Sequence, residues 1–360
     1  MVTRLLNISF VLLILIFISC EDRLFLEREP ELALANGVYE FEPGGYQFDH
    51  VILENDNFLY SAFPCNEDNT ITFFNIDISG TYQMSLIFEN DTIFSRSVYL
   101  NEIHNDLIEI TVLDVSQGDS FIISPLNERP SVMDGGFGTM GFYDWQDGGE
   151  PTLLNYLKDE GIADLKYILQ THDDADHYGG LNDVVNDGTI TCDDYFTNNS
   201  TDLPAVNDTL FFSDDVFGIM LHYGDLPTDI LDSVETEENN RSITMKLVYK
   251  DLEMLFTSDI EVETEEYLLQ QSYFQSFQNY DILKVPHHGS SSSSSEDFLE
   301  YVRPKLSVIS VGEGNPWDHP TDEVLGRLKA NSGSILRTDI NGSIRILTDG
   351  RSIQTISGQK

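Results

Sequence analysis

Apolar and polar residues are arranged differently before and after about residue 107. Between residues 36 and 100, short apolar stretches are separated by turn-forming residues, and residues 81–88 alternate in polarity before the turn Glu89-Asn90-Asp91. Alternation with a period of two beside a turn is typical of a β-hairpin. The pattern therefore predicts a small all-β domain at residues 36–105.

Beyond residue 107, apolar strand candidates alternate with amphipathic helix candidates. The predicted helices cover residues 152–160 and 323–329, with apolar residues at spacings of three to four. The predicted strands cover residues 108–115, 120–125, 165–171, 243–249, 253–257, 281–285 and 305–311. This order indicates an α/β layered domain, which we place at residues 107–358 and expect to fold without residues 21–100. Residues 289–295, one glycine and six serines, are interpreted as a mobile loop.

The N-terminus carries a targeting signal. Arg4 precedes an apolar run over residues 5–18, which ends at Ser19-Cys20. The run is too short for an ordinary membrane span, and its final cysteine resembles the bacterial lipobox, in which the cysteine is acylated and becomes the new N-terminus. We predict a lipoprotein signal peptide at residues 1–19, a tether at residues 20–35, and anchoring through Cys20 in the outer membrane on its periplasmic or cell-surface face. An uncleaved anchor and an ordinary signal peptide are the alternatives.

Composition narrows the chemistry. Sixty-two acidic and 19 basic residues give a net charge of −43, which disfavours nucleic acid as a ligand because it repels polyphosphate at long range. Residues 240–360 hold 12 basic and 17 acidic residues, a net of −5, so an anion would bind in the last third. With Cys20 acylated, only Cys65 and Cys192 remain, and no CxxC motif exists. A metal site must therefore be built from histidine and carboxylate.

Five of the eight histidines fall in three short motifs. The first motif, Thr171-His172-Asp173-Asp174-Ala175-Asp176-His177-Tyr178-Gly179-Gly180, directly follows an apolar strand candidate. It offers four potential ligands within six residues, which can surround two cations: His172, Asp174, Asp176 and His177. The glycine pair permits close backbone approach. An acidic solvated loop would explain the aspartates, but not both histidines and the glycine pair.

The remaining motifs also stand next to predicted strands or helices. Asp259 ends the apolar stretch Leu255-Phe256-Thr257-Ser258-Asp259, and His287-His288 follows the strand candidate 281–285. Adjacent histidines on an extended chain point to opposite sides, so one would reach a metal while its neighbour faces the substrate. His319 precedes a predicted helix, and a helix-start histidine without a catalytic part is the alternative there.

Six segments, taken in order, resemble the metallo-β-lactamase fold family, and specifically the hydrolase domain that accompanies ComEC, the DNA-uptake channel. They span about two-thirds of the chain and are Leu113-Asp114-Val115-Ser116-Gln117-Gly118-Asp119-Ser120, the His172 motif, the strand ending at Asp259, Lys284-Val285-Pro286-His287-His288-Gly289-Ser290, His319-Pro320 with Glu323-Val324-Leu325, and Arg337-Thr338-Asp339 with Thr348-Asp349-Gly350. The resemblance implies an αββα sandwich with metals at the sheet edges. Residues 36–105 resemble an immunoglobulin-like β-sandwich, with Gly80-Thr81-Tyr82 as the reminiscent motif.

The resemblance also implies a ligand set for two divalent metal ions, zinc or manganese. The implied ligands are His172 and Asp174 for one ion, Asp176, His177 and His287 for the other, and Asp259 as the bridge between them. Asp174 stands where most of the superfamily has histidine. The usual third histidine of the first site is not evident, because only His222 lies between His177 and Asp259. Oxygen-rich sites favour harder ions, which makes manganese as suitable as zinc.

The predicted activity is metal-dependent hydrolysis of a phosphodiester or another small anionic substrate. Two cations about 3.5–4 Å apart would activate a bridging water, Asp176 would accept its proton, and His288 or His319 would protonate the leaving group or bind its anion. Lys284 and Arg337 are further candidate anion contacts. A phosphodiesterase or nuclease is the first hypothesis. Hydrolysis of esters, lactones or β-lactams on the same site and a non-catalytic surface-binding lipoprotein are the alternatives, and no obligate protein partner is evident.

Overall fold

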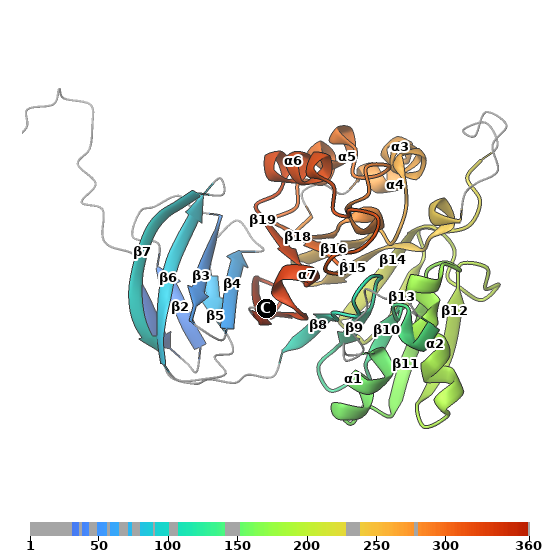
Figure 1. Ribbon diagram of the computed structural model, residues 1–360, viewed down its shortest axis with the longest axis horizontal. Coiled ribbons are helices and arrows are strands. Elements are labelled where there is room, and N and C mark those ends of the chain that lie inside the picture. The colour runs from blue at the N-terminus through green and yellow to red at the C-terminus, as the bar shows by residue number, and fades with distance from the viewer. Residues whose placement is uncertain are drawn as a thin grey trace, which may run out of the picture.

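The computed structural model describes residues 31–35, 38–42, 49–55, 58–64, 71–73, 80–88, 91–100, 107–140, 152–227, 238–276 and 280–358. Figure 1 shows an N-terminal group of strands beside a larger part that contains both strands and helices. The predicted signal peptide, Cys20, Cys65 and most of the predicted tether lie outside the described residues. No helix within these described ranges is both long enough and apolar enough to cross a membrane.

The N-terminal part contains two layers of strands. One layer is a three-stranded antiparallel sheet of β1 (Glu31–Ala35), β2 (Val38–Glu42) and β5 (Ile71–Phe73). The other layer contains β4 (Phe58–Pro64), β3 (His50–Glu54), β6 (Gly80–Phe88) and β7 (Asp91–Leu100), in that order. The predicted hairpin is β6–β7, and its alternation buries Tyr82, Met84 and Leu86. β1 corrects the tether prediction, because the last five residues of the expected tether pair with β2.

The α/β part is a sandwich of two sheets with helices on both outer faces, as the αββα prediction requires (Figure 1). The first sheet contributes β12 (Thr191–Thr197), β11 (Asp164–Gln170), β10 (Ser131–Met133), β9 (Phe121–Ser124), β8 (Ile108–Val112), β20 (Ile344–Thr348) and β21 (Ser352–Gly358). The second sheet is β13 (Thr209–Phe211), β14 (Val216–His222), β15 (Thr244–Tyr249), β16 (Leu252–Phe256), β17 (Ile282–Lys284), β18 (Leu306–Ile309) and β19 (Ser334–Arg337). Apolar side chains of both sheets form the central core, where the rings of Phe121 and Phe256 meet edge to face at 5.1 Å.

Helices close the sandwich on each side. α1 (Leu153–Asp159) and α2 (Ala175–Asp187) pack on the first sheet. The second sheet is covered by α3 (Val262–Gln270), α4 (Ser272–Gln275), α5 (Glu296–Val302) and α6 (Asp322–Asn331). The remaining helical segments are short: η1 (Gly138–Met140), η2 (Asn239–Arg241), η3 (Pro286–Gly289) and α7 (Thr338–Asn341). Thr152, Ser295 and Thr321 cap α1, α5 and α6 because their hydroxyl oxygens accept hydrogen bonds from first-turn backbone N–H groups.

Strand β21 joins the two parts of the chain. It lies in an eleven-stranded sheet of order β12-β11-β10-β9-β8-β20-β21-β4-β3-β6-β7, pairing antiparallel with β20 on one side and with β4 on the other. All seven residues of β21 pair with β4. Leu347 and Ile356, from β20 and β21, are buried in the apolar cluster of the N-terminal strands. The two parts therefore share one sheet and part of one core.

The serine-rich run is a packed turn, which corrects the expectation of a mobile loop. Ser293 and Ser294 are buried, and the buried Glu265 carboxylate accepts hydrogen bonds from the backbone N–H groups of Ser294 and Ser295, at 2.5 and 2.8 Å. A buried carboxylate that receives backbone donors fixes the chain around it. Small side chains are what this turn needs, so low complexity here reflects tight packing.

Candidate metal centre

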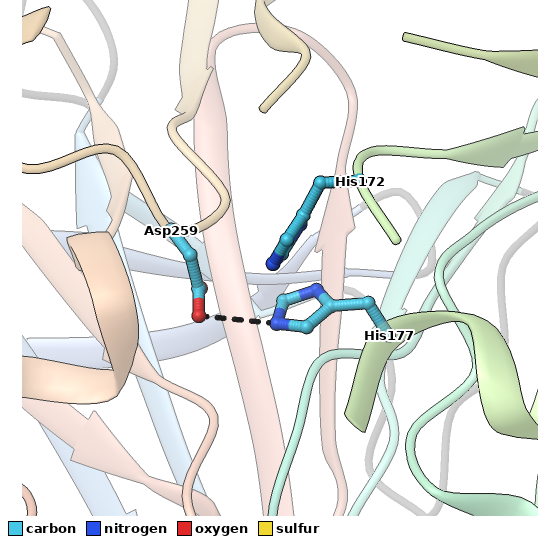
Figure 2. Close-up of side chains that lie close together, drawn as sticks. All are labelled: His172, His177 and Asp259. Carbon is cyan, nitrogen blue, oxygen red and sulfur yellow. Dashed lines mark ion pairs between the residues drawn. The ribbon is translucent and has the colours of Figure 1, made fainter. Parts of the chain in front are cut away.

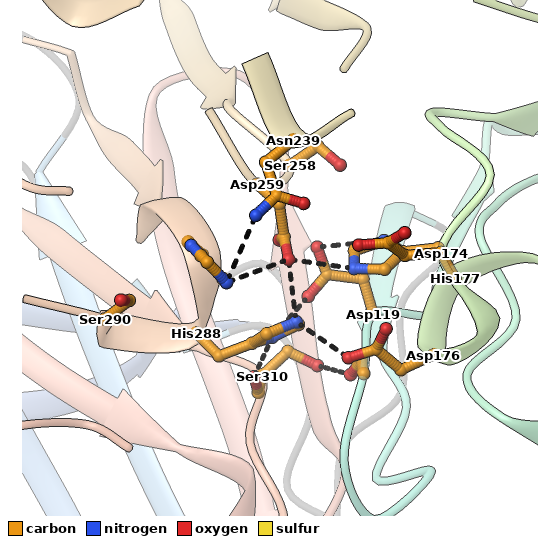
Figure 3. A network of polar contacts seen from close by, with 12 residues as sticks. Asp119, Asp174, Asp176, His177, Asn239, Ser258, Asp259, His288, Ser290 and Ser310 are labelled. Atoms are coloured by element: carbon orange, nitrogen blue, oxygen red, sulfur yellow. Dashed lines mark hydrogen bonds and ion pairs between the residues drawn. The ribbon is translucent and has the colours of Figure 1, made fainter. Parts of the chain in front are cut away.

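Loops that leave the strands of both sheets meet at one edge of the sandwich. These loops carry the residues predicted from the sequence: His172 and Asp174 after β11, Asp176 and His177 in the first turn of α2, Asp259 after β16, and His287 and His288 in η3 after β17. In the chain these residues are spread over more than a hundred positions. The fold brings them into one network of polar contacts (Figure 3).

Three histidines of this network are buried, and each is held by its Nδ1 atom. His177 Nδ1 lies 2.8 Å from Asp134 Oδ2, and His288 Nδ1 lies 2.7 Å from the Ser310 carbonyl oxygen. His172 Nδ1 lies 3.0 Å from the hydroxyl oxygen of Thr171. The Asp134 carboxylate and the Ser310 carbonyl oxygen can only accept hydrogen bonds, so His177 and His288 donate from Nδ1. An Nδ1 donor leaves Nε2 as the atom with a free lone pair.

The Nε2 atoms of the same three histidines lack a hydrogen-bond partner although they are buried. His177 Nε2 and His288 Nε2 each lie 3.2 Å from Asp259 Oδ2. His172, His177 and Asp259 point toward one another in Figure 2, and one ligand atom from each lies within 4.8 Å of the others. Buried polar atoms without partners are rare in folded proteins. Their convergence here is the arrangement expected around a cation.

Burial and charge oppose each other at these histidines. Burial lowers the pKa of His288, but the carboxylates of Asp259 and Asp119 outweigh it and raise that pKa to about 10. Burial likewise lowers the pKa of His177, and Asp259 and Asp134 hold it well above its usual value. For Asp259 the signs reverse: burial raises its pKa, while His288, His177 and Lys284 keep it well below the ordinary range. The electrostatic potential at the site is therefore negative, and it stabilises positively charged groups there.

Asp176 and Asp174 lie nearer the surface. Asp176 Oδ2 is 3.4 Å from His288 Nε2, and Asp176, His177 and His288 form a second group of mutually close ligand atoms. Burial raises the pKa of Asp176, but the contact with His288 and the charge of His177 lower it to about 2. The Asp174 side chain is 50% exposed, and its Oδ2 lies 3.6 Å from His172 Nε2. Asp174 therefore lies at the surface beside His172, and it belongs to none of the groups of close ligand atoms found among the described residues.

The structure reverses the positions expected for the two adjacent histidines. His288, predicted as a proton donor, is buried among the carboxylates, whereas His287, predicted as a metal ligand, has its Nε2 4.0 Å from Asp259 Oδ2 and its Nδ1 3.2 Å from Glu261 Oε1. The expectation assumed an extended chain. Both residues instead adopt left-handed backbone angles, φ 47° and 51°, inside η3, so the alternation of a strand does not apply.

Sequence reasoning missed two buried residues of this network, Asp119 and Asp134, and gave a third, Lys284, a different role. Asp119 precedes β9, Asp134 follows β10, and Lys284 is the last residue of β17. Asp119 lay within a segment already recognised by resemblance, and Asp134 follows an apolar stretch and precedes a glycine pair, which is the same signature as the histidine motifs. Lys284 was predicted as an anion contact. The structure corrects this, because its side chain is fully buried against Asp119 and Asp259.

The other predicted contacts lie outside the buried cluster. The His319 ring lies 5.7 Å from the His287 ring, and burial, together with the nearby His288 and His287, lowers the pKa of His319 to about 4. Arg337 forms an ion pair with Asp339. His222 Nε2 lies 2.8 Å from the Asn240 carbonyl oxygen and is absent from every group of close ligand atoms among the described residues.

The glycine pair of the first motif, Gly179 and Gly180, lets two backbone segments lie in close contact, as predicted. A Cβ atom on Gly179 would lie 2.2 Å from the Phe137 carbonyl oxygen, and one on Gly180 would lie 1.9 Å from the Gly135 carbonyl oxygen. Real Cβ atoms do not come that close to a carbonyl oxygen. Without side chains at these positions, α2 can press its first turn, with Asp176 and His177, against the loop that follows Asp134.

The donor set fits divalent cations. Three imidazole Nε2 atoms and the carboxylates of Asp176 and Asp259 form two overlapping groups, one around His172, His177 and Asp259 and one around Asp176, His177 and His288. Imidazole suits zinc, while carboxylate oxygen suits manganese and other hard ions. The fixed Nδ1 donors are the support that ligating histidines receive in metal sites.

Comparisons with known proteins show which family the chain is similar to. Residues 113–191 match the family model of the metallo-beta-lactamase superfamily. The chain is 29% identical over 257 residues to ComE operon protein 3 of Bacillus subtilis, an alignment that covers 66% of this chain and 32% of that protein. It is 30% identical over 249 residues to Recombination protein 2 of Haemophilus influenzae, covering 66% of this chain and 28% of that protein. The predicted resemblance to the ComEC-type metallo-β-lactamase domain is confirmed.

A third relative, competence protein ComA of Neisseria gonorrhoeae, is 27% identical over 242 residues, covering 66% of this chain and 32% of that protein. This chain therefore spans about a third of the length of the curated relatives it matches. Among solved structures, the metallo-beta-lactamase fold protein YhfI from Bacillus subtilis is 10% identical with a TM-score of 0.39, covering 64% of this chain and 96% of that one.

Proposed function

The chain carries a metallo-β-lactamase domain of the type found in ComEC-like competence proteins, and on that premise we propose that it is a metal-dependent phosphodiesterase with two divalent cations. The observation that carries the proposal is the set of three buried Nε2 atoms, on His172, His177 and His288, which have no hydrogen-bond partner and surround the Asp259 carboxylate. A structural histidine cluster would satisfy these atoms with acceptors or water. A cation satisfies all of them at once.

Each residue has a distinct task in this proposal. His172 and Asp259 belong to the group that would hold one ion, and Asp176 and His288 to the group that would hold the other, while the single free lone pair of His177 Nε2 would serve one of the two ions. When bound, divalent cations supply Lewis acidity and lower the pKa of a coordinated water. The low pKa of Asp176 keeps it ionised, so its carboxylate can accept a proton from the attacking water.

The partly exposed imidazoles are the groups available to the leaving group. The side chain of His287 is 21% exposed, and His319 lies beside it with a buried Nδ1 atom that lacks a hydrogen-bond partner. Either ring can place an N–H group toward the departing oxygen and bind its anion by a hydrogen bond, but His319, with its pKa lowered to about 4, is neutral at neutral pH and has no acidic proton to give. Neither Lys284 nor Arg337 is placed to do so, because both form ion pairs within the protein.

Two observations favour a phosphodiester over a carboxylic ester. Two of the relatives are named as a recombination protein and a competence protein. Charge is nearly balanced in residues 240–360, where 12 basic and 17 acidic residues stand against a net charge of −43 for the whole chain. The remaining acidic surface repels long polyanions. We therefore propose a short phosphodiester as the substrate.

The substrate class is tested with purified full-length chain in detergent, stripped of metal and then supplied with Mn²⁺ or Zn²⁺. Bis(p-nitrophenyl) phosphate should be hydrolysed only after metal addition, while p-nitrophenyl acetate and nitrocefin remain intact. Hydrolysis of the acetate or of nitrocefin with an intact phosphodiester would reassign the site to ester or β-lactam chemistry. No metal uptake and no turnover on any of the three would favour a non-catalytic binding protein.

We also propose that acylated Cys20 anchors the protein to a membrane. The support is the sequence alone, an apolar run of 14 residues followed by Ser19-Cys20. Acyl chains contribute roughly 0.8 kcal/mol per buried methylene, so several chains hold a protein firmly. Cys20→Ala should release the protein from the membrane fraction and abolish palmitate labelling. A variant that still pellets with membranes and still takes up palmitate contradicts the assignment.

A further inference from the structure

Lys284 is a fully buried lysine within the metal centre. Its ammonium nitrogen lies 2.7 Å from Asp119 Oδ2, 3.2 Å from Asp259 Oδ1 and 2.5 Å from the Ser258 carbonyl oxygen. No part of this side chain is accessible to solvent. A substrate cannot reach it, so its role must be exercised through the groups it touches.

The contacts of Lys284 divide the oxygens of two carboxylates into two kinds. On Asp259, Oδ1 faces the ammonium, whereas Oδ2 lies 3.2 Å from His177 Nε2 and from His288 Nε2. On Asp119, Oδ2 faces the ammonium, whereas Oδ1 is buried without a hydrogen-bond partner, 3.4 Å from His288 Nδ1. Each carboxylate therefore presents one oxygen to the lysine and one to the histidines.

We propose that Lys284 is a positioning residue that makes Asp259 offer a single oxygen to the metal centre and keeps Asp119 beside it without repulsion. The inference rests on the proposed metal centre, but not on the proposed substrate. An Asp259 carboxylate with both oxygens free could chelate one ion through two contacts. With Oδ1 held by an ammonium, Oδ2 alone is left for the side on which the histidines converge.

Charge explains why a lysine occupies this position. Asp119, Asp259 and His288 offer ligand atoms within 4.8 Å of one another, so the two carboxylates are close neighbours in the buried interior. Two such charges repel strongly at low dielectric. An ammonium between them removes the repulsion with three directed donors, and it also binds the Ser258 carbonyl, which fixes the turn that carries Asp259.

The test measures metal binding by the metal-free full-length chain, with Mn²⁺ and Zn²⁺ titrated by calorimetry and bound metal counted after gel filtration. Lys284→Met keeps the length of the side chain and removes the charge. The matched control is Lys246→Met, because Lys246 is also buried and ion-paired, to Glu253 at 2.9 Å, but lies on β15 away from the centre. We expect two equivalents in the parent and in the Lys246 variant. Lys284→Met should bind its second equivalent about 10–100-fold more weakly, the usual cost of losing a supporting contact.

A second pair of variants covers the case in which Lys284→Met does not fold. Asp119→Asn removes one of the two repelling charges, so Asp119→Asn/Lys284→Met should fold and still bind the second ion more weakly than Asp119→Asn alone. Equal stoichiometry and affinity within either folded pair would overturn the positioning role while leaving the metal centre intact. A parent that binds no divalent cation would overturn the proposed function together with this inference.

Discussion

Two buried histidines in different parts of the molecule respond to burial in opposite ways. His50, in β3 of the N-terminal part, is 3% exposed and stacks on Phe63 with ring centroids 4.7 Å apart. Burial lowers its pKa to about 4. His288 is 1% exposed, yet Asp259 and Asp119 overcome the effect of burial and raise its pKa to about 10.

The opposite pKa shifts of His50 and His288 indicate that the candidate metal centre is arranged to hold positive charge. A buried imidazole left to itself stays neutral, because an apolar interior disfavours the charged form. The α/β part instead surrounds its buried imidazoles with carboxylates, at the cost of bringing several negative charges together. Such an arrangement is stable only when a positive charge occupies it, and His50 shows that the same chain buries histidine without one elsewhere.

The largest expected effect comes from removing the Asp259 carboxylate, which lies close to the buried histidines of the metal centre. Asp259→Ala should abolish hydrolysis, by roughly 10⁴-fold or more, because the ligand group with His172 and His177 loses its carboxylate and both His177 Nε2 and His288 Nε2 lose the oxygen that lies 3.2 Å from each of them. Metal content should fall with it. His319→Ala serves as the comparison variant: turnover should drop by only about 10–100-fold, as expected for the loss of one hydrogen bond to an anion, with parental metal content. Parental metal and turnover in Asp259→Ala would refute the dinuclear centre.

The next test separates the two adjacent histidines. His288→Ala should lose metal and about 10³-fold or more in turnover, because His288 Nε2 belongs to a ligand group with Asp176 and His177. His287→Ala should keep its metal and lose turnover more modestly, about 10–100-fold. Metal analysis of both purified variants decides the matter, and retention of metal in His288→Ala with loss in His287→Ala would restore the assignment made from the sequence.

A third test asks whether the two parts of the comparison unfold together. Leu53→Ala removes a fully buried side chain from the N-terminal core and should cost about 2–5 kcal/mol. Both tryptophans, Trp145 and Trp317, lie beyond residue 107. Because β21 pairs with β4, we expect the denaturant midpoint of tryptophan fluorescence to fall in this variant. A fluorescence midpoint that stays at the parental value, while circular dichroism shows early loss of strands, would mean independent units.

The smallest expected effect is on the stability of the protein at acidic pH, through His50. The pKa of His50 is lower in the folded chain than its usual value of 6.5, so the stability that comes from keeping it neutral is present above pH 6.5 and is lost as the pH falls toward about 4. The shift corresponds to about 3 kcal/mol. His50→Gln cannot titrate. Its free energy of unfolding should fall less than the parent's between pH 6.5 and pH 4, and equal pH dependence of the two proteins would show that His50 charges without cost.

Most residues of the candidate site could be predicted, because histidines and carboxylates that can bind metal stand close together in short sequence motifs. His172 and Asp259 stand in the loops that follow apolar strands, and Asp176 and His177 stand in the first turn of the next helix, so a local pattern places all four at a sheet edge. The exchange between His287 and His288 was not predictable, since it depends on left-handed backbone angles in η3. Lys284 was misread for a related reason: its partners come from loops after other strands, and only the fold brings a carboxylate to a lysine 165 positions away, as with Asp119.

The fold class and part of the strands and helices could likewise be predicted from the sequence. Apolar stretches identified β8, β9, β11 and β15 to β18, and helical spacing identified α1 and α6, whereas several other elements, including α2 and β14, were not predicted. The order of these elements indicated an α/β layered domain, and the family resemblance supplied the αββα class. Strand partners were not encoded in such patterns. The pairing of β21 with β4 joins Phe63 and Ile353 across 290 positions, and no local signal near either residue identifies the other. The domain boundaries drawn at residues 36–105 and 107–358 remain a prediction, although one sheet crosses them.

The placement of β21 sets the order in which the molecule can be completed during synthesis. β4 is made early and then waits for β21, the last strand of the described chain, before its outer edge is covered. Contacts between such distant segments slow folding, and an uncovered strand edge invites pairing with other chains. Changes confined to residues 352–358 would therefore damage the N-terminal strands as much as the α/β part. Nascent chains that stall just short of these residues should be the most prone to aggregate.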